Sequence, residues 1–111
     1  MPKNTIQETE QLTDAMYYIM LSLVEQRHGY AIMKYIAELS NQTICIGPGT
    51  LYTLLKKLSN ADWIIQISSD ERTKTYQITE TGLHILRTEI KRRRYMVEDG
   101  LRVLREAGYE E

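Results

Sequence analysis

Residues 47–60 read GPGTLYTLLKKLSN and are the most informative stretch of this 111-residue chain. Pro48 suits the first position of a helix, where its missing N–H group is not needed. Four leucines then follow at the spacing i, i+3, i+4 and i+7, which is typical of one buried helical face: Leu51, Leu54, Leu55 and Leu58. The opposite face is polar and carries Thr50, Tyr52, Thr53, Lys56, Lys57 and Asn60. We therefore predict an amphipathic helix over residues 47–60 that packs on a core and exposes a row of hydrogen-bond donors.

Two helices and a short strand are predicted upstream of this segment. Residues 14–26 are apolar on nearly every side, which is typical of a central core helix or of one that a partner subunit also covers. Residues 30–39 place their apolar side chains on one face and form the second predicted helix. Apolar Ile44 and Ile46 alternate with polar neighbours in residues 43–46, and this alternation predicts a very short strand.

A β-hairpin is predicted downstream, over residues 63–68 and 73–79. Both segments are rich in β-branched and aromatic residues, and a polar loop separates them. Ile65 and Ile67 alternate with polar residues in the first strand, and Tyr76 and Ile78 alternate with polar residues in the second. One face of the hairpin is therefore expected to be apolar, and the other is expected to face water.

A long last helix begins at Thr79-Glu80 and continues to about Ala107 without a proline. Such a helix spans roughly 40 Å, so it must project from a domain of this size. Apolar residues recur along it at seven-residue intervals: Leu83, Ile90, Val97 and Leu104. This repeat favours pairing with a second helix, although Arg93 and Gly100 interrupt the companion positions. We interpret the helix as a dimer arm rather than a long regular coiled coil, and its arginine run as a solvated face paired with Glu89 and Glu98.

The predicted fold class is mainly α with a small β-hairpin, a winged helix-turn-helix followed by a long C-terminal dimerisation helix. In such a fold the helix before the wing lies in the major groove of DNA. We expect an N-terminal arm over residues 1–12, a DNA-binding domain over residues 13–79, and the dimerisation helix with its tail over residues 80–111. The predicted dimer interface comprises Met16, Met20, Leu83, Leu86, Ile90, Val97, Leu101 and Leu104.

The exposed face of the third predicted helix suits DNA on chemical grounds. Hydroxyl groups can bond to base edges or to the backbone, and the N–H groups at the helix start can bind phosphate. Lys56 and Lys57 can pair with phosphate as point charges, and Arg72 and Lys74 flank the hairpin tip, where a wing meets the DNA backbone or the minor groove. With two residues of the second helix added, the candidate DNA-binding residues are Tyr30, Lys34, Pro48, Gly49, Thr50, Tyr52, Thr53, Lys56, Lys57, Arg72 and Lys74.

Charge and composition further restrict the partners and the location that we expect for this protein. The formal net charge of −1 argues against a protein that coats nucleic acid by bulk charge, although residues 31–60 contain three lysines and one glutamate. The apolar run over residues 16–24 is too short for a bilayer, which needs about 20 apolar residues, so we expect no membrane partner and a cytoplasmic location. Cys45 is the only cysteine, and we interpret it as a buried structural thiol rather than a redox sensor.

Three stretches of the sequence indicate a family resemblance by their residues, order and spacing: His28-Gly29-Tyr30-Ala31-Ile32-Met33-Lys34, Pro48-Gly49-Thr50-Leu51-Tyr52, and Tyr76-Gln77-Ile78-Thr79-Glu80-Thr81-Gly82. They closely resemble the PadR-like transcriptional regulators, and the resemblance covers about residues 14–107. The chain departs from that pattern at Thr53, where family members often have proline, and at Asp70 and Glu71, which make the wing less basic than usual. The single C-terminal helix looks like the shorter subgroup of the family.

The resemblance implies a homodimeric repressor that binds a pseudo-palindromic operator in double-stranded DNA and is released by a small effector. In the shorter subgroup it implies sensors of planar aromatic drugs, which bind between the subunits at the first and fourth helices and stack in some members on a tryptophan of the last helix. The last helix here has no tryptophan, so we do not carry over that role. The remaining candidates for a small aromatic effector are Tyr17, Tyr95 and Met96, and plain packing is the favoured interpretation of Tyr17.

Two other classes are weighed against a DNA-binding regulator. A dimeric small-molecule-binding or protein-interaction module could use the same fold without reading DNA, and the acidic wing tip motivates that alternative. An enzyme is not expected, because the sequence has no recognisable arrangement of nucleophile, base and orienting group. No metal or other cofactor is expected either, since two histidines and one cysteine far apart in the sequence make a poor ligand set.

Overall fold

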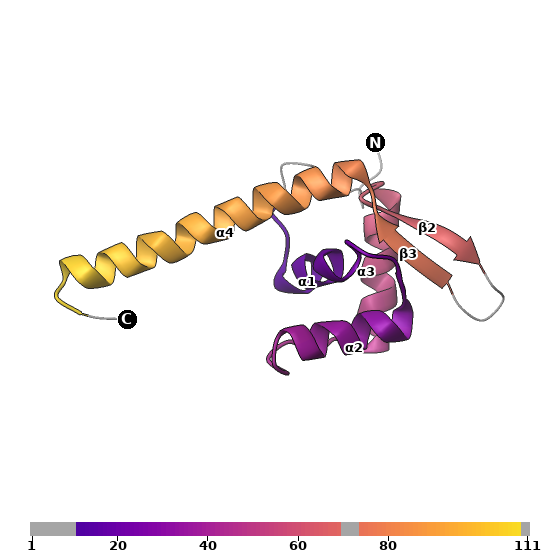
Figure 1. Cartoon of the computed structure of the whole chain (residues 1–111), viewed down its shortest axis with the longest axis horizontal. Coiled ribbons are helices and arrows are strands. Elements are labelled where there is room, and N and C mark those ends of the chain that lie inside the picture. The colour runs from indigo at the N-terminus through magenta and orange to yellow at the C-terminus, as the bar shows by residue number, and fades with distance from the viewer. Residues whose placement is uncertain (1–10, 70–73, 110–111) are drawn as a thin grey trace.

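The computed structural model describes residues 11–69 and 74–109, and its helices and strands are shown in Figure 1. In chain order they are α1 (Asp14–Ser22), β1 (Arg27–His28), α2 (Gly29–Leu39), α3 (Pro48–Asn60), β2 (Ile64–Ser69), β3 (Lys74–Ile78) and α4 (Glu80–Glu106). Helices α1, α2 and α3 lie together, the hairpin of β2 and β3 extends to one side, and α4 projects to the other. The predicted fold class is confirmed.

Threonine hydroxyl groups cap the N-termini of α1 and α4. The Oγ1 atom of Thr13 accepts a hydrogen bond from the N–H of Met16 at 3.2 Å, and Thr79 accepts one from the N–H of Gly82 at 3.0 Å. Thr79 also donates to the carbonyl oxygen of Asp62 at 2.7 Å. Because Asp62 directly follows α3 in the chain, this bond fixes the start of α4 against the end of α3.

The first helix is shorter than residues 14–26, the length that its apolar pattern predicts. It ends at Ser22, whose hydroxyl donates to the carbonyl oxygen of Ile19 at 2.6 Å. The next carbonyl, that of Leu23, accepts a hydrogen bond from the N–H of Ile78 at 2.8 Å. The chain therefore leaves the helix to run beside the sheet, and tertiary bonding overrides the local helical pattern.

The third strand of the sheet is β1, which lies directly before α2 and was not predicted. The antiparallel sheet has the order β1-β3-β2, and Arg27 of β1 pairs with Tyr76 of β3. The strand predicted over residues 43–46 is wrong, because these residues have no strand partner and form an irregular connection. The hydroxyl oxygen of Ser40 accepts from the N–H of Ile44 at 3.0 Å and supplies the bonding that a strand would have provided.

The apolar face of the hairpin also differs from the prediction. In β2 the buried residue is Ile64, which pairs with Ile78, whereas Ile65 and Ile67 are 56% and 48% exposed. A bulge in β2 breaks the strict alternation, and the core-facing side begins one residue earlier than the pattern suggests. In β3, Tyr76 and Ile78 are buried as predicted.

One hydrophobic core joins the three short helices, the base of the hairpin and the first turns of α4. Three residues of the predicted dimer interface are buried in this core within a single chain: Met16, Met20 and Leu86. Two more are half-buried against it: Leu83 and Ile90. These five residues therefore pack within the chain itself, and the other three predicted interface residues lie further along α4, outside the core: Val97, Leu101 and Leu104.

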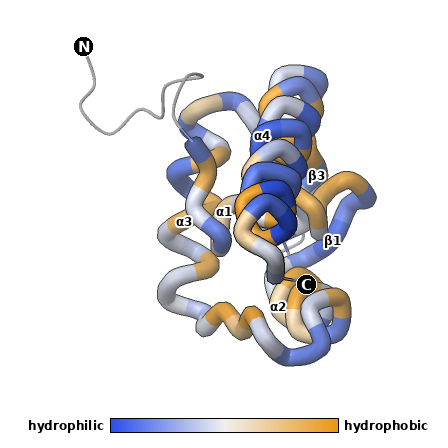
Figure 2. The backbone as a smooth tube through the Cα atoms, turned by 90° about the vertical axis from the view of Figure 1, so that its left-hand side faces the viewer, coloured by the Kyte–Doolittle hydropathy of each residue, from blue (hydrophilic) through white to orange (hydrophobic). Residues whose placement is uncertain are grey.

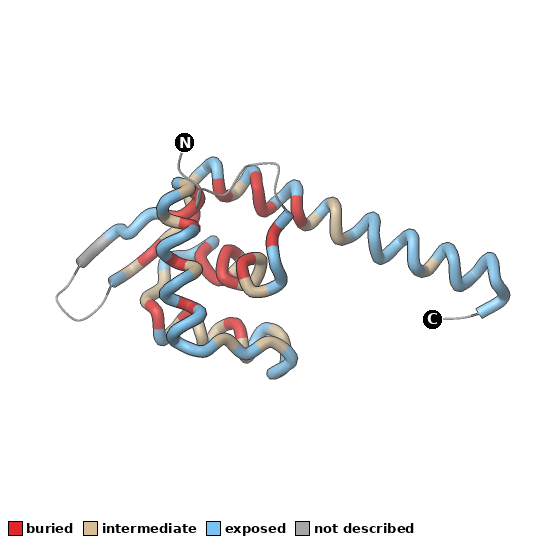
Figure 3. Tube along the Cα trace, turned by 180° about the vertical axis from the view of Figure 1, so that it is seen from behind, coloured by how far each residue is buried: buried red, intermediate tan, exposed pale blue. Residues whose placement is uncertain are grey.

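Helix α4 leaves the domain after its first turns. Figure 3 shows its buried positions only near the start, and mainly exposed positions along the rest. Figure 2, which looks toward its free end, shows hydrophobic and hydrophilic segments along the whole helix. The helix contains 27 residues, which corresponds to about 40 Å. It therefore accounts for much of the longest dimension of the molecule, 58 Å.

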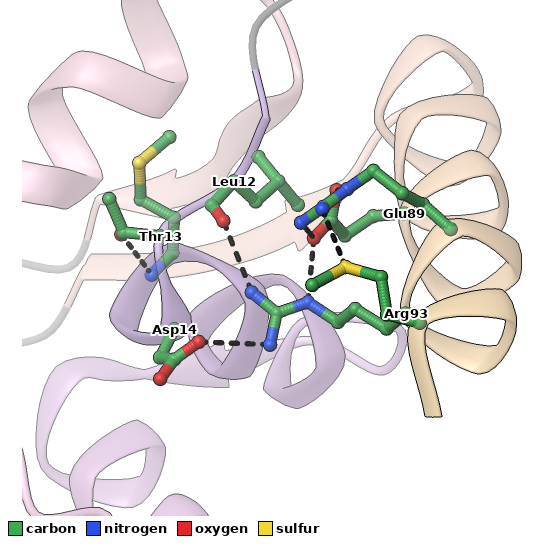
Figure 4. A network of polar contacts seen from close by, with 8 residues as sticks. Leu12, Thr13, Asp14, Glu89 and Arg93 are labelled. Atoms are coloured by element: carbon green, nitrogen blue, oxygen red, sulfur yellow. Dashed lines mark hydrogen bonds and ion pairs between the residues drawn. The ribbon is translucent and has the colours of Figure 1, made fainter. Parts of the chain in front are cut away.

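An ion-pair network centred on the buried Glu89 joins α4 to the start of α1 (Figure 4). Glu89 is only 4% exposed and accepts hydrogen bonds from the Nε atoms of Arg92 at 3.0 Å and Arg93 at 2.6 Å. Arg93 also donates to the carboxylate of Asp14 at 2.9 Å and to the carbonyl oxygen of Leu12 at 3.1 Å. The predicted pairing with Glu89 is present, but among the described residues Glu98 forms no ion pair, so that part of the prediction is wrong. The network is a structural junction rather than a solvated face, which explains why Arg93 interrupts the apolar repeat of α4.

Replacing Glu89 with glutamine is expected to lower the free energy of unfolding at pH 7 by about 1–3 kcal/mol, because both arginines lose a charged acceptor. Burial raises the pKa of Glu89, but the hydrogen bonds and charges of Arg92 and Arg93 outweigh it, so the pKa lies below its ordinary value of 4.5. The carboxylate therefore contributes its full stabilisation above about pH 4.5, and that contribution is lost as the pH falls through the lowered pKa.

Thermal melts of the parent protein and of Glu89→Gln between pH 7 and pH 2 test this prediction. The two melting temperatures should differ most near neutrality and should converge at the acid end of the series. A difference that stays constant over the whole series would contradict an ionised Glu89 as the source of the stabilisation.

Candidate nucleic-acid interface

Helix α3 is amphipathic in the structure, as its sequence predicts. Leu51, Leu55 and Leu58 are each at most 1% exposed and pack into the core. The other side of the helix is exposed and carries Thr50, Tyr52, Thr53, Lys56, Lys57 and Asn60. Residues 48–60 contain no acidic side chain, so this surface offers hydroxyl and ammonium donors without carboxylates that would compete for them. Such a surface suits an anionic partner.

The N-terminus of α3 is accessible to an anionic group. Gly47 occupies the cap position without a side-chain hydrogen bond, and Pro48 follows at the start of the helix. A Cβ atom placed on Gly49 would meet no atom within 4 Å in the described part of the chain. The N–H groups of the first turn and the positive end of the helix dipole are therefore open to a ligand.

Helix α2 begins beside the exposed face of α3. The hydroxyl of Tyr52 lies so close to Gly29 that a Cβ atom there would overlap it. Tyr30 and Lys34 follow on α2 and are both exposed. The structure thus brings the start of α2, which holds the predicted Tyr30, next to the predicted Tyr52.

The hairpin contributes one described residue to the predicted set. Lys74 begins β3 and is exposed. Arg72, also predicted to contact DNA, lies outside the described residues, as do its acidic neighbours Asp70 and Glu71.

A cavity of about 340 Å³ that is open to solvent lies between α3 and the hairpin. It is lined by Tyr52, Leu55, Lys56, Ser59, Gln66, Lys74 and Tyr76. Burial raises the pKa of Tyr76, and the nearby Tyr52 raises it further. Both lysines are predicted DNA-binding residues, but the sequence does not place them at one cavity, and Ser59, Gln66 and Tyr76 are not among the predicted site residues. The alternation of β3 puts Lys74 and Tyr76 on one face of the hairpin, but only the observed pairing of Gln66 with Tyr76 adds Gln66 to that face.

The candidate effector residues lie at or near the junction of α1 and α4. The ring of Tyr17 packs edge-on against the ring of Tyr18, with 5.5 Å between the two centroids. The guanidinium of Arg93 lies 4.3 Å from the centroid of the Tyr17 ring. Tyr95 and Met96 are exposed on α4, where the Sδ atom of Met96 accepts a hydrogen bond from Arg92 at 2.9 Å. Tyr17 therefore has packing partners within the chain, and an effector role for these residues stays a prediction.

Cys45 is exposed, so the prediction of a buried thiol is wrong. Its Sγ atom lies 3.7 Å from the carbonyl oxygen of Gln42, in the irregular connection between α2 and α3. Ile44 and Ile46 are half-buried on either side of it. The alternation in this segment therefore turns the two isoleucines toward the core and leaves the thiol on the solvent side.

Two further properties concern residues 11–69 and 74–109 only. No helix within these ranges is both long enough and apolar enough to cross a membrane. The same residues contain no group of three or more His, Cys, Asp or Glu side chains placed to hold a metal ion.

The three-helix arrangement, the hairpin and the exposed polar face of the helix before it define a winged helix-turn-helix protein. Within this class, the model of the transcriptional regulator PadR-like family matches residues 19–88. This match spans more than half of the chain, and the chain belongs to the PadR-like family of transcriptional regulators.

Solved structures of other regulators have the same fold. A PadR family transcriptional regulator from Eggerthella lenta aligns with a TM-score of 0.73 at 23% identity, over 87% of this chain and 83% of its own. RosR of H. salinarum aligns with a TM-score of 0.62 at 25% identity, over 79% of this chain and 76% of its own. A transcriptional regulator from Clostridium thermocellum aligns with a TM-score of 0.65 at 20% identity, over 77% of this chain and 86% of its own. No curated protein sequence matches the chain.

Proposed function

We propose that the protein is a homodimeric, sequence-specific DNA-binding repressor that binds a pseudo-palindromic operator and is released by a small aromatic effector. The exposed face of α3 carries the proposal, since it combines an accessible helix N-terminus with hydroxyl and ammonium donors and has no acidic residue. The major groove admits one helix, and hydroxyl and amide side chains can bond to the base edges there. Membership in a family of transcriptional regulators supports the same function.

Within α3 we assign different roles to the two halves of the helix. Gly49, Thr50, Tyr52 and Thr53 lie in the first half, and side chains from that half of a recognition helix contact base edges. Lys56 and Lys57 lie one turn further along and would neutralise phosphates, which positions the protein without selecting a sequence. The remaining members of the proposed DNA-binding set surround this helix: Tyr30, Lys34, Pro48, Arg72 and Lys74.

The proposal includes two copies of the chain held together by α4. Ile90, Val97, Leu101 and Leu104 lie on one side of this helix, because their spacings of four and seven residues return to nearly the same direction. Beyond Arg93 this side is mainly exposed in the described chain, since Val97 and Leu104 are 61% and 42% exposed and Leu101 is half-buried. Residues 13–79 would then act as the DNA-binding domain, residues 80–111 as the dimerisation segment and residues 1–12 as an arm.

The junction of α1 and α4 is the proposed region of effector action. Tyr95 and Met96 expose an aromatic ring and a thioether close to Arg92 and Arg93, and aromatic rings and thioethers both pack well against planar aromatic ligands. A ligand that moves α4 relative to α1 would change the distance between the two copies of α3. Repression would then be lost without any contact between the ligand and α3.

Selection of bound duplexes from a randomised pool tests the proposed function. The protein should enrich one motif with two inverted half-sites about 10 base pairs apart, or a multiple of that spacing, as two-fold related recognition helices require. Recovery of unrelated sequences would contradict sequence-specific binding and would favour an interaction module on the same fold.

Two variants refine this selection. Thr53→Ala is expected to change the enriched bases at one position of each half-site, whereas Lys57→Ala should weaken all sequences alike and leave the motif unchanged. If both variants enrich the parent motif with unchanged affinity, α3 does not contact the DNA.

Gly29→Ala is expected to disturb DNA binding with little loss of stability. The added methyl group overlaps the hydroxyl of Tyr52, and this flexible side chain can move away at a cost of roughly 1 kcal/mol. Affinity for the selected motif should fall to about the level of Tyr52→Ala, because both changes remove the tyrosine from its place. Introducing Gly29→Ala into Tyr52→Ala should have no further effect, and additive losses would contradict this mechanism.

A further inference from the structure

We propose that the cavity between α3 and the hairpin is the seat of a single phosphate group of the DNA backbone, held jointly by Lys56 and Lys74. This inference rests on the proposed function, because it requires α3 to lie in the major groove. It goes further by assigning a ligand to this cavity and by giving Lys56 and Lys57 different roles.

The chemistry of the lining suits an oxyanion. Lys56 and Lys74 supply two ammonium groups, Tyr52, Tyr76 and Ser59 supply hydroxyl groups, and Gln66 supplies an amide. Among the described residues, no carboxylate lines the cavity and neither lysine forms an ion pair. An anion bound between the two side chains would make a favourable charge contact with each ammonium group.

The position of the cavity selects DNA phosphate as its ligand. One wall belongs to α3 and the other to β2 and β3, so the cavity lies between the helix and the wing. When a helix occupies the major groove, each side of that groove is bordered by a phosphate backbone. A wing beside that helix must pass outside one of these backbones, which places a phosphate between the two walls.

Lys57 provides an internal comparison. It is the next residue on the same helix, it is exposed and it carries the same charge, but it does not line the cavity. Loss of Lys56 or of Lys74 should therefore affect the same phosphate, whereas loss of Lys57 should not affect that phosphate.

Operator duplexes that carry one neutral methylphosphonate at a time test the assignment. For the parent protein, a methylphosphonate at the assigned phosphate of each half-site should reduce affinity by roughly tenfold, because a charge-assisted contact is lost there, and positions contacted by other residues should also be sensitive. The double variant Lys56→Ala/Lys74→Ala should bind more weakly overall and should be insensitive to a methylphosphonate at that position alone. Lys57→Ala should keep the sensitivity of the parent protein.

The outcomes separate this inference from the proposed function. If the parent protein does not distinguish the operator from scrambled duplex, the proposed function itself fails. If it does distinguish them, but the double variant and Lys57→Ala lose sensitivity at the same positions or at none, the assigned phosphate seat is wrong. Lys56 and Lys74 are both exposed, so replacing either or both of them with alanine should preserve the fold.

Inorganic phosphate separates a DNA contact from a site for a free anion. At constant ionic strength, phosphate should displace the operator from the parent protein and from Lys56→Ala/Lys74→Ala equally poorly. Displacement from the parent protein alone at low phosphate concentration would assign the cavity to a free anion and would overturn the proposal.

Discussion

Replacing Gly82 with alanine is expected to destabilise the protein by about 1–3 kcal/mol, which is the usual cost of forcing an extra carbon into a packed region. Gly82 lies in the first turn of α4, where a Cβ atom would overlap the carbonyl oxygen of Trp63 and lie 2.7 Å from Cγ1 of Ile78. The overlapped oxygen belongs to the backbone, and Trp63 is 1% exposed, so neither side can move freely. The result should be a clear fall in the urea concentration at the midpoint of unfolding.

Gly100→Ala is the matched control, because Gly100 lies in the same helix and a Cβ atom there meets nothing within 4 Å. Alanine at an open helical position stabilises by about 0.5–1 kcal/mol relative to glycine. Opposite shifts for the two variants are therefore expected. If Gly82→Ala unfolded at the same urea concentration as the parent protein, the close packing of α4 on Trp63 would be wrong.

Val97→Asp is expected to convert the protein from a dimer into a monomer and to reduce operator affinity by about 10²-fold or more, since two linked half-site contacts are replaced by one. Val97 is 61% exposed on the projecting half of α4, so the change should leave the fold of each chain intact. An aspartate in the apolar stripe of a paired helix would be buried without a partner charge. Sedimentation velocity and a titration with operator duplex measure the two effects on one sample.

Val103→Asp controls for the added charge. Val103 is 59% exposed on the same half of α4, but it lies about 120° around the helix from Val97. This variant should remain dimeric and should keep most of the operator affinity. A parent protein that sediments as a monomer at micromolar concentration, or two variants that behave alike, would contradict the proposed dimer.

The elements that could be predicted from sequence are those whose local patterns agree with their tertiary surroundings. Helix α3 is the clearest case, because the leucine spacing, Pro48 and the polar opposite face all indicate one helix with one buried side. Thr79 likewise indicated the start of α4, and the structure shows its hydroxyl in the cap position. The predicted DNA-binding residues on α3 are all exposed, although their contacts with DNA remain a proposal.

The predictions that proved wrong concern segments whose structure is decided by contacts between residues distant in the sequence. Strand β1 has only two residues and exists because Arg27 reaches the edge of β3, which no local pattern could show. Ile65 and Ile67 fit the alternation of a buried strand face, but the bulge in β2 and the pairing of Ile64 set the opposite phase. The cavity beside Lys56 could not be predicted, because it depends on how the hairpin packs against α3, and no local pattern gives that packing.

The burial of Met16 and Met20 shows a different limit of prediction from sequence. An apolar helix predicts burial, but the pattern cannot tell whether the cover comes from the same chain or from a second subunit. Here the chain covers both methionines itself. The junction of Glu89 with Arg93 was also only partly predictable, because Asp14 lies 79 residues from Arg93 along the chain.

The claim that α3 binds DNA sequence-specifically can be tested by a titration against two duplexes. The duplexes are the promoter DNA of the protein's own gene and a scrambled sequence of equal length and composition, each measured over a series of salt concentrations. We predict that the promoter duplex binds at least about 10³-fold more tightly at physiological salt. Equal affinity for the two duplexes at every salt concentration would contradict the claim.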